Sequence, residues 1–561
     1  MNKRILKKSV VISIMLLFMG MSVVPSTGNV KQITIPMSSG NTLYVGGNGT
    51  GNYSKIQNAI DNASDGDAIF IYNGTYVENL LVDKSITIMG EDKATVVLDE
   101  GGNEFSYGIM IRSDNTTIMD MTIQNYTLFT VGSGVKITDS SIRDIILTNL
   151  NIINNWHGII LCNHSSQIQN IVLTNITLHN NTYGIRLIGT TNCIVSNCNF
   201  HSNQIGMAVD TSYNNLIQNN TFHHDTMGMV GFQLSHYIHI VNGNTVNGKA
   251  LLYFKNQTDL LLDNEAGQII LVNCSNVHIR NLTLNDTRFG VYIAFSDNIT
   301  ISNSSFSRSG IMLDKSKDST IISNNIYDNH NSVGIGIAFS NNNKIISNTI
   351  HNHDFKAIRL YSSNNNIIRS NTIYNNKLGI DLYSSSNYNM IYHNNLNNTQ
   401  NAATDECNNT WDDGYPSGGN YWSDYTGEDK DGDGIGDTPF GSTPNQDRYP
   451  LMFPYGEESG VKITTPEKGY LYIRNIKILP FYTTLLLGNI KIKANAANYI
   501  YGIDRVEFYV DNIKRRIDST PPYSWTWRLS SHIKHRHTIK VIAYDTTGAN
   551  VDDDLKVWRF F

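Results

Sequence analysis

The sequence predicts an all-β protein whose central part is a parallel β-helix, a solenoid of short stacked strands. The first observation is a motif of the general form Gly-Ile-x-Leu, followed by polar turn residues, that recurs along the chain. Each copy alternates apolar and polar residues as strands do, and no helical stretch separates the copies. A period of about 20 to 25 residues with this pattern is typical of coils stacked in a solenoid. The motif opens at Gly158, Gly184, Gly206, Gly290, Gly310 and Gly379, with Ala357 in the glycine's place in a further copy.

The second observation is that asparagine recurs at one phase of this repeat, ahead of the residue that opens the motif. One residue type at one phase should form a ladder, in which each amide donates to and accepts from its neighbours one coil away. A disordered, asparagine-rich tract is the alternative, but the apolar residues keep strict phase with the asparagines, which favours the solenoid. The residues concerned are Asn149, Asn175, Asn197, Asn219, Asn281 and Asn348.

Residues 1–28 have the layout of a signal peptide. A basic start is followed by an apolar run from Val10 to Val24 and then by Pro25-Ser26-Thr27-Gly28. This order predicts export and removal of the leader. A retained N-terminal anchor is the alternative, because no clean small-x-small cleavage site stands out, although the run is short for a membrane span.

The overall charge and the cysteines narrow the class of protein. The 561 residues carry a formal net charge of −6, and no basic stripe is present, which argues against nucleic acid as a partner. The five cysteines are few for an exported chain, and their spacing matches no zinc or redox motif. Most of them are therefore expected to be small buried or turn residues.

Residues 41–107 are expected to form an N-terminal cap and the first coils. The segment from Tyr53 to Ala63 has apolar residues at helical spacing, as an amphipathic helix over the open end of a solenoid would have. It is followed by the strand-like segments Gly66–Ile71, Gly74–Glu78 and Lys84–Gly90. This order resembles the start of pectin-lyase-like β-helices, especially the NosD family, named for a periplasmic copper-binding protein. The resemblance implies a right-handed parallel β-helix with PbH1 repeats, and an association with copper.

Three further segments follow. Residues 108–398 hold the repeats. Residues 399–456 contain aromatic and Asp-rich stretches and resemble the segment that closes NosD-like helices, so they are interpreted as a C-terminal cap. Residues 459–561 lose the repeat, show longer alternating strands and resemble a small immunoglobulin-like β-sandwich of surface and secreted proteins.

The cap contains the strongest metal-binding motif. Asp429, Asp431, Asp433 and Asp437 occupy positions 1, 3, 5 and 9 of a loop with Gly434 at position 6, as in the first part of an EF-hand-like calcium loop. Position 12 is Phe440 rather than glutamate, and no flanking helices are evident. The interpretation is one structural Ca²⁺, with a solvated acidic turn as the alternative.

A column of histidines is a second candidate metal site. His179, His201 and His223 each follow an inward apolar residue, so they should point outward on adjacent coils. Stacked imidazoles can share a borderline metal, which is the only support from the residues for the copper implied by the resemblance. A solvent-facing ladder without metal is the favoured alternative, because the chain has no dense cluster of His, Met and Cys.

Two neighbouring copies of the motif carry a candidate sugar platform. Arg359 and Asp381 share one outward position, and Tyr361 and Tyr383 share another two residues later. Aromatic faces beside charged groups can stack on a sugar ring and bind its hydroxyls. Cross-strand stabilisation by the same residues is the alternative. Arg186 and Asp210 form a smaller, diagonal pair in other copies.

The resulting interpretation is a secreted or cell-surface β-helix that binds carbohydrate or adheres to it without catalysis. Its partner would be an extracellular polysaccharide or cell-surface glycan, with no nucleic acid, and a membrane only if residues 1–28 are retained. A polysaccharide lyase, epimerase or hydrolase is the first alternative, although no catalytic residue can be named. NosD-like copper handling is the second.

Overall fold

The computed structural model describes residues 40–103, 105–330, 332–404, 407–430, 433–456, 459–498, 503–528 and 535–560. The predicted signal peptide or anchor at residues 1–28 lies outside them. Within the described ranges, no helix is both long enough and apolar enough to cross a membrane.

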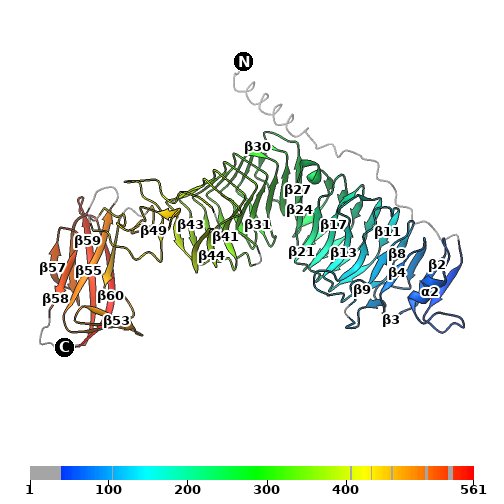
Figure 1. The fold of residues 1–561 in the computed structure, drawn as a ribbon, viewed down its shortest axis with the longest axis horizontal. Helices are drawn as coiled ribbons and strands as arrows, with labels where there is room; N and C mark the ends of the chain where they lie inside the picture. The colour runs from blue at the N-terminus through cyan, green and yellow to red at the C-terminus, as the bar shows by residue number, and fades with distance from the viewer. Residues whose placement is uncertain are drawn as a thin grey trace, which may run out of the picture. The chain divides into compact units, whose positions relative to one another are not determined.

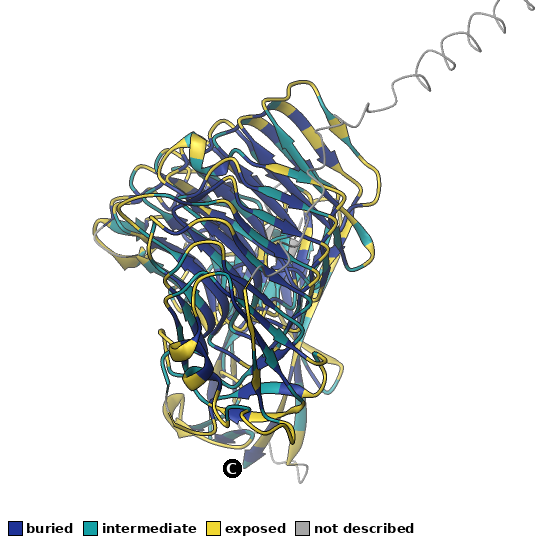
Figure 2. Ribbon diagram, turned by 90° about the vertical axis from the view of Figure 1, so that its right-hand side faces the viewer, coloured by how far each residue is buried: buried dark blue, intermediate teal, exposed yellow. Residues whose placement is uncertain are grey.

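The described chain is almost entirely β, and its strands stack side by side in successive coils (Figure 1). The predicted amphipathic helix is α2 (Ile56–Asn62), which buries Ile56, Ala59 and Ile60. A short 3₁₀ helix, η1 (Leu234–Tyr237), is the other helical element described. Buried residues lie mainly in the strands, whereas the turns are largely exposed (Figure 2).

The first solenoid runs from β1 to β26 and has three parallel sheets. Sheet A contains β1 (Thr42–Val45), β2 (Ala68–Ile71), β5 (Thr87–Gly90), β8 (Thr117–Met119), β11 (Ile145–Thr148), β15 (Ile171–Thr174), β19 (Ile194–Ser196), β22 (Leu216–Gln218) and β25 (Ile240–Asn242). Sheet B contains β3 (Gly74–Val77), β6 (Val96–Asp99), β9 (Thr122–Gln124), β12 (Asn151–Ile153), β16 (Thr177–His179), β20 (Asn199–His201), β23 (Thr221–His223) and β26 (Thr245–Val246). Sheet C contains β4 (Leu80–Val82), β7 (Ile109–Ile111), β10 (Ser133–Ile137), β13 (His157–Cys162), β17 (Tyr183–Ile188), β21 (Ile205–Asp210) and β24 (Met227–Val230). A short pair, β14 (Ile168–Gln169) and β18 (Thr190–Thr191), lies in the turns.

The second solenoid runs from β27 to β48 and also has three parallel sheets. Sheet D contains β27 (Lys249–Lys255), β29 (Gln268–Val272), β32 (Val291–Ala294), β35 (Ile311–Asp314), β38 (Ile335–Ala338), β41 (Lys356–Tyr361), β44 (Leu378–Tyr383) and β47 (Gln400–Thr404). Sheet E contains β28 (Leu261–Leu262), β30 (Ser275–Arg280), β33 (Asp297–Ser302), β36 (Thr320–Ile322), β39 (Lys344–Ile346), β42 (Ile367–Arg369) and β45 (Met390–Tyr392). Sheet F contains β31 (Thr283–Asn285), β34 (Ser305–Ser307), β37 (Asn325–Tyr327), β40 (Thr349–His351), β43 (Thr372–Tyr374), β46 (Asn395–Asn397) and β48 (Tyr421–Trp422).

The Gly-Ile-x-Leu motif forms sheet C in the first solenoid and sheet D in the second. Its two apolar positions point inward and align from coil to coil, as Ile185 with Met207 and Leu187 with Val209 do. All four side chains are fully buried. Glycine opens the motif because a Cβ at Gly184 would lie only 2.4 Å from the backbone oxygen of Gly206 in the next coil. The motif therefore encodes both the core and the close spacing of the coils.

The strand direction reverses between the two solenoids. β26 pairs antiparallel with β27, with Val246 opposite Lys249, so sheets B and D form one 16-stranded sheet. β29 is buried on both faces: Ile270 and Val272 pack into the core of the first solenoid, whereas Ile269 and Leu271 belong to the core of the second. Nothing in the repeat pattern of residues 108–398 predicts this reversal.

The asparagine ladders are more extensive than expected and lie mainly at other positions. Asn149, Asn175, Asn197, Asn219 and Asn281 adopt positive φ at turns, and only one bond of the expected kind joins two of them, from Asn175 to Asn149 at 3.1 Å. The long ladders are buried. One of them contains Asn348, and in it each Nδ2 donates to the Oδ1 of the next coil at 2.9–3.1 Å; its members are Asn324, Asn348, Asn371, Asn394 and Asn420.

The two C-terminal parts close the chain. In the cap, Trp422 packs against both Trp411 and Phe440, and buried Asp447 accepts a hydrogen bond from Trp422 Nε1 at 2.8 Å. The cap also holds the antiparallel pair β49 (Phe440–Ser442) and β50 (Asn445–Asp447).

The terminal domain is a β-sandwich of a three-stranded and a seven-stranded sheet around its own core. The smaller sheet contains β51 (Ser459–Thr465), β55 (Ile490–Asn498) and β58 (Ser524–Trp527). The larger contains β53 (Ile476–Pro480), β52 (Tyr470–Ile473), β54 (Thr484–Leu487), β60 (Asn550–Phe560), β59 (Arg536–Asp545), β56 (Ile503–Val510) and β57 (Ile513–Asp518).

One buried ladder ends in a carboxylate, which generates a prediction about stability. Asn155, Asn181 and Asn203 lead to Asp225, which accepts bonds from Asn203 N–H and Nδ2 at 2.9 and 2.8 Å. Burial nevertheless raises the pKa of Asp225 from 3.8 to about 7. Because the folded-state pKa lies above the unfolded value, the penalty of the buried charge is absent below pH 3.8, grows as the pH rises, and is complete above pH 7.

We therefore expect Asp225→Asn to raise the free energy of unfolding by on the order of 2 kcal/mol at pH 8 and to leave it nearly unchanged at pH 4. The amide can take both bonds on its Oδ1, as Asn181 does for Asn155. Denaturant unfolding at the two pH values measures this, with the exposed Asp318→Asn as control. A loss of stability at pH 8 would contradict the prediction.

Candidate functional site

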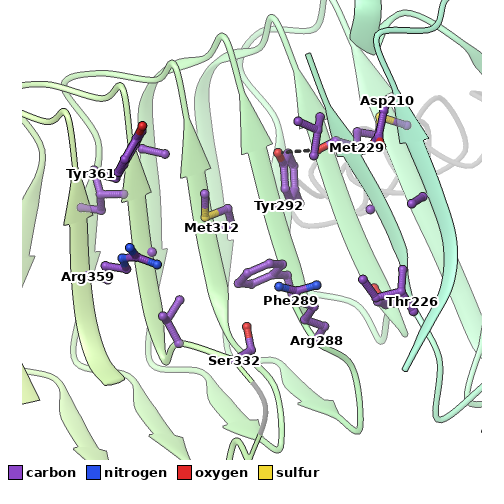
Figure 3. Close-up of a pocket in the computed structure, with 18 of the residues that line it drawn as sticks. Asp210, Thr226, Met229, Arg288, Phe289, Tyr292, Met312, Ser332, Arg359 and Tyr361 are labelled. Carbon is purple, nitrogen blue, oxygen red and sulfur yellow. Dashed lines mark hydrogen bonds between the residues drawn. The ribbon is translucent and has the colours of Figure 1, made fainter. Parts of the chain in front are cut away.

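A groove of about 500 Å³ lies where the outer face of sheet D meets the last strands of sheet C (Figure 3). Gln268 Nε2 donates to the carbonyl of Met227 at 2.9 Å and Tyr292 Oη donates to the carbonyl of Met229 at 2.7 Å, which joins the two sheets at the groove's base. The polar, charged and aromatic residues of its lining are Tyr183, Arg186, Asp210, Thr226, Arg288, Phe289, Tyr292, Ser332, Phe355, Arg359 and Tyr361.

The variable x position of the motif forms the groove's walls. On sheet C this column runs Arg186, Ala208, Gly228 in register, and on sheet D it runs Tyr292, Met312, Gly336, Arg359, Asp381. Most side chains at this position point away from the core of their own coil, so their identity can vary without disturbing the solenoid. Tyr292 is an exception, because it is buried against the core of the first solenoid. Small residues at Ala208, Gly228 and Gly336 leave the space that larger outward residues would fill.

The wall on sheet C carries the Arg186–Asp210 pair. Arg186 Nε donates to Asp210 Oδ2 at 3.0 Å, and the guanidinium lies 5.0 Å from the centre of the Tyr183 ring. Burial raises the pKa of Asp210, and the Arg186 charge opposes that rise. The sequence places this pair in copies of the motif remote from Arg359, but the structure brings both to one groove.

The wall on sheet D carries the predicted platform. Arg359 pairs in register with Asp381, and Tyr361 with Tyr383; the two tyrosine rings are 5.6 Å apart, and the Arg359 guanidinium lies 5.2 Å from the Tyr383 ring. Arg359 and Tyr361 line the groove, whereas Asp381 and Tyr383 lie on the adjoining strand beyond its lining. The four residues thus form one cluster that extends out of the groove.

Several lining or neighbouring residues were not among those predicted. Lys356, which opens β41, donates to Asp381 Oδ2 at 2.6 Å. Arg288, Phe289 and Phe355 precede motif strands at the same end of sheet D. These residues share one sequence feature, a large side chain one to three residues ahead of the motif. That feature alone does not predict a groove, because the groove forms only when the strand reversal places sheet C opposite these side chains.

The three histidines of the candidate metal site lie on adjacent coils. β16, β20 and β23 place His179, His201 and His223 in register, and the rings of His179 and His201 stack at 4.7 Å with 7° between their planes. Burial first, and then the adjacent imidazole, lowers the pKa of both His179 and His201. They are therefore neutral at neutral pH and retain a lone pair for a metal.

The Asp-rich loop folds as a tight turn in the part that is described. Asp429 is buried and its Oδ2 accepts the N–H of Gly434 at 2.9 Å, Asp433 accepts from Ile435 at 2.8 Å, and Asp437 accepts from Lys430 at 2.6 Å. Asp431 lies outside the described residues. Among those that are described, no three His, Cys, Asp or Glu side chains converge as a metal site, although the loop's hard carboxylate oxygens are of the kind that Ca²⁺ prefers.

Comparison with protein families identifies three parts of the chain. Residues 107–265 match the family described as right handed beta helix region, and residues 482–541 match the bacterial Ig domain. Residues 255–427 match the family described as periplasmic copper-binding protein (NosD).

The NosD match covers most of the second solenoid. The predicted fold class, a right-handed parallel β-helix with an immunoglobulin-like sandwich, is confirmed. Sheet D, with its wall of the groove, lies almost entirely within the NosD segment, whereas sheet C lies in the first solenoid. Residues 66–90, which carry one part of the resemblance, lie outside all three matched ranges, whereas residues 399–427 of the predicted cap lie inside the NosD match.

Solved structures add only distant similarities. The A-module of mannuronan C-5 epimerase AlgE6 from Azotobacter vinelandii is 13% identical over 63% of this chain and 93% of that chain, with a TM-score of 0.21. Pectin methylesterase PemA from Erwinia chrysanthemi is 12% identical over 51% and 79%, with a TM-score of 0.21. The fibronectin(III)-like modules of CbhA from Clostridium thermocellum are 27% identical over 18% of this chain and 46% of that one, with a TM-score of 0.15. TM-scores this low contribute nothing to the functional argument. Among curated proteins, none matches the chain significantly.

The groove's geometry predicts which glycine can be enlarged. A Cβ at Gly228 would meet no atom within 4 Å. We expect Gly228→Phe to fill part of the groove and to change the free energy of unfolding by no more than about 0.5 kcal/mol. Gly184→Ala, by contrast, should destabilise the protein by about 1–3 kcal/mol, because its methyl group would meet the Gly206 backbone. Denaturant unfolding of both variants checks this, and equal destabilisation would show that the space at Gly228 is not open.

Proposed function

We propose that this protein is an extracellular or cell-surface β-helix that binds polysaccharide in the groove between sheets C and D without altering it chemically. The observation that carries the proposal is the groove itself, in which aromatic rings and guanidinium groups face one another across an open space. Sugar rings offer apolar faces for stacking and hydroxyls for hydrogen bonds, and such a lining serves both.

The lining also supports binding over turnover. Its one carboxylate among the described lining residues is Asp210, and that group is held by Arg186. Most glycosidases use two carboxylates that flank the scissile bond, one of them free to take or give a proton. The descriptions of two matched families, a periplasmic protein and a bacterial Ig domain, favour a location outside the cytoplasm.

Two metal ions belong to the proposal as finer points. Asp429, Asp431, Asp433 and Asp437 would hold a structural Ca²⁺ that stabilises the cap. His179, His201 and His223 would hold copper, which is the second candidate function, favoured by the stacked neutral imidazoles and by the NosD description. A metal shared by two imidazoles at about 2 Å from each nitrogen needs those nitrogens within about 4 Å, so the rings would have to rotate from their parallel stack.

The first experiment is retention of the purified protein on immobilised neutral and uronate-containing polysaccharides, with turnover followed by double-bond absorbance and reducing ends. We expect retention on at least one polymer without turnover, and at least ten-fold weaker binding by Gly228→Phe because its ring occupies the groove. Thr300→Phe, which adds the same ring to sheet E, should bind as the unmodified protein does.

The alternatives would be recognised in the same assay. Turnover of any polymer would replace the binding proposal by a lyase, epimerase or hydrolase. An undiminished affinity of Gly228→Phe would move the binding site away from the groove, and absence of retention on every polymer would overturn the proposal.

Metal binding is tested by equilibrium dialysis followed by thermal unfolding. We expect Ca²⁺ at a hundred times its dissociation constant to stabilise the protein by about 2.7 kcal/mol, and the double variant Asp433→Asn/Asp437→Asn to lose this gain. Copper should be retained after dialysis, and lost when His201→Ala and His223→Ala are combined. His278→Ala, on sheet E, is the control for the second pair. No bound Ca²⁺, or copper that survives the histidine changes, would contradict the respective assignment.

A further inference from the structure

The charged residues of the groove indicate which class of polysaccharide it binds, an inference that rests on the proposed function. Three arginines line the groove, Arg186, Arg288 and Arg359, against one carboxylate, Asp210. Arg186 and Asp210 neutralise each other in a direct ion pair. The charges that decide the ligand are therefore those of Arg288 and Arg359.

The one carboxylate near Arg359 also pairs with a lysine. Its Nε is 3.2 Å from Asp381 Oδ2, but the N–H makes no hydrogen bond, and the Nε atom is buried. The same Asp381 oxygen accepts a hydrogen bond from Lys356 Nζ at the shorter distance of 2.6 Å. Lys356 and Arg359 together thus exceed the single charge of Asp381.

Arg288 is an exposed cation whose side chain forms no ion pair with any carboxylate in the described part of the chain. Its one ring contact is with Phe289, 5.6 Å from the guanidinium carbon to the ring centre. Figure 3 shows Arg288 and Phe289 together at the floor of the groove, with Met312 between them and Arg359. The chain as a whole carries −6, so this local positive charge runs against the general trend.

Arg288 and Arg359 come from coils of sheet D that are not neighbours. Arg288 lies three residues before the start of β32 and Arg359 lies on β41, and β35 and β38 lie between those strands. Three strand spacings amount to about 14 Å. A ligand that satisfies both must repeat its negative charge along its length and cross the strands of sheet D.

We infer that the groove binds an anionic polysaccharide, whose successive carboxylate or sulfate groups are held by Arg288 and Arg359 while its sugar rings pack on the intervening apolar floor. Guanidinium groups pair with carboxylates and sulfates through two parallel N–H bonds, which suits repeated acidic groups on a stiff polymer.

The test is affinity electrophoresis and calorimetry with four polymers: polygalacturonate, the same polymer after carboxyl reduction, dextran sulfate and neutral dextran. We expect the two anionic polymers to bind and the reduced and neutral ones to bind at least ten-fold more weakly. Arg288→Gln and Arg359→Gln should each weaken anionic binding about ten-fold, since a charge-assisted hydrogen bond contributes roughly that factor. A trimmed oligomer that is too short to reach both arginines should lose the effect of one of the two substitutions.

Arg280→Gln is the matched control, because Arg280 is on sheet E and pairs with Asp263 outside the groove. Arg288 is exposed, so Arg288→Gln keeps the test valid even if Arg359→Gln perturbs folding. Equal binding of native and carboxyl-reduced polymer would overturn the anionic class while leaving a glycan-binding groove. An equal loss with Arg280→Gln would overturn the assignment to the two arginines, and binding of none of the four polymers would overturn it together with the proposed function. Preference for dextran sulfate over polygalacturonate would identify sulfate as the group held.

Discussion

A β-helix leaves unpaired strand edges wherever it stops, and the need to cover them determines much of this structure. At the N-terminal end, α2 buries Ile56, Ala59 and Ile60 over the first coil. At the far end, Trp411, Trp422 and the buried carboxylate of Asp447 close the core. Between them, the edge of sheet B is paired by β27, which runs in the opposite direction. The groove exists because the antiparallel pairing of β26 with β27 places the outer face of sheet D against the end of sheet C.

The coils themselves could be predicted from the sequence, because their constraints are local. Ile185 and Leu187 alternate with an outward residue, and Gly184 marks the place where the next coil comes too close for a side chain. The sequence pattern predicts the asparagine ladder at turn positions, whereas most members of the long ladders are buried asparagines at other positions of the repeat. Turn asparagines with positive φ and buried asparagines such as Asn371 occur at similar intervals, and only burial separates them.

The candidate site was predictable in part for the same reason. Arg359, Tyr361, Asp381 and Tyr383 lie on adjacent strands, so their clustering follows from the register of the repeat alone. Arg186 and Asp210 could not be joined to them, because their proximity depends on how two solenoids meet, which no periodicity encodes. Arg288 was invisible for a related reason: it lies in a turn, where the repeat imposes no orientation on the side chain.

The reversal of strand direction between β26 and β27 also determines where coils can be gained or lost in evolution without changing the groove. Each coil pairs with the coil before it and the coil after it through nearly the same strand and asparagine contacts. Duplication or deletion of a coil far from the β26–β27 pair therefore changes the length of the solenoid and leaves the contacts of the neighbouring coils intact. Which strand of sheet C faces which strand of sheet D across the groove depends on how many coils separate each of them from the antiparallel β26–β27 pair. Gain or loss of coils near either end therefore changes the length of the β-helix. A single coil gained beside the β26–β27 pair would instead bring different side chains into the groove and so change its binding surface.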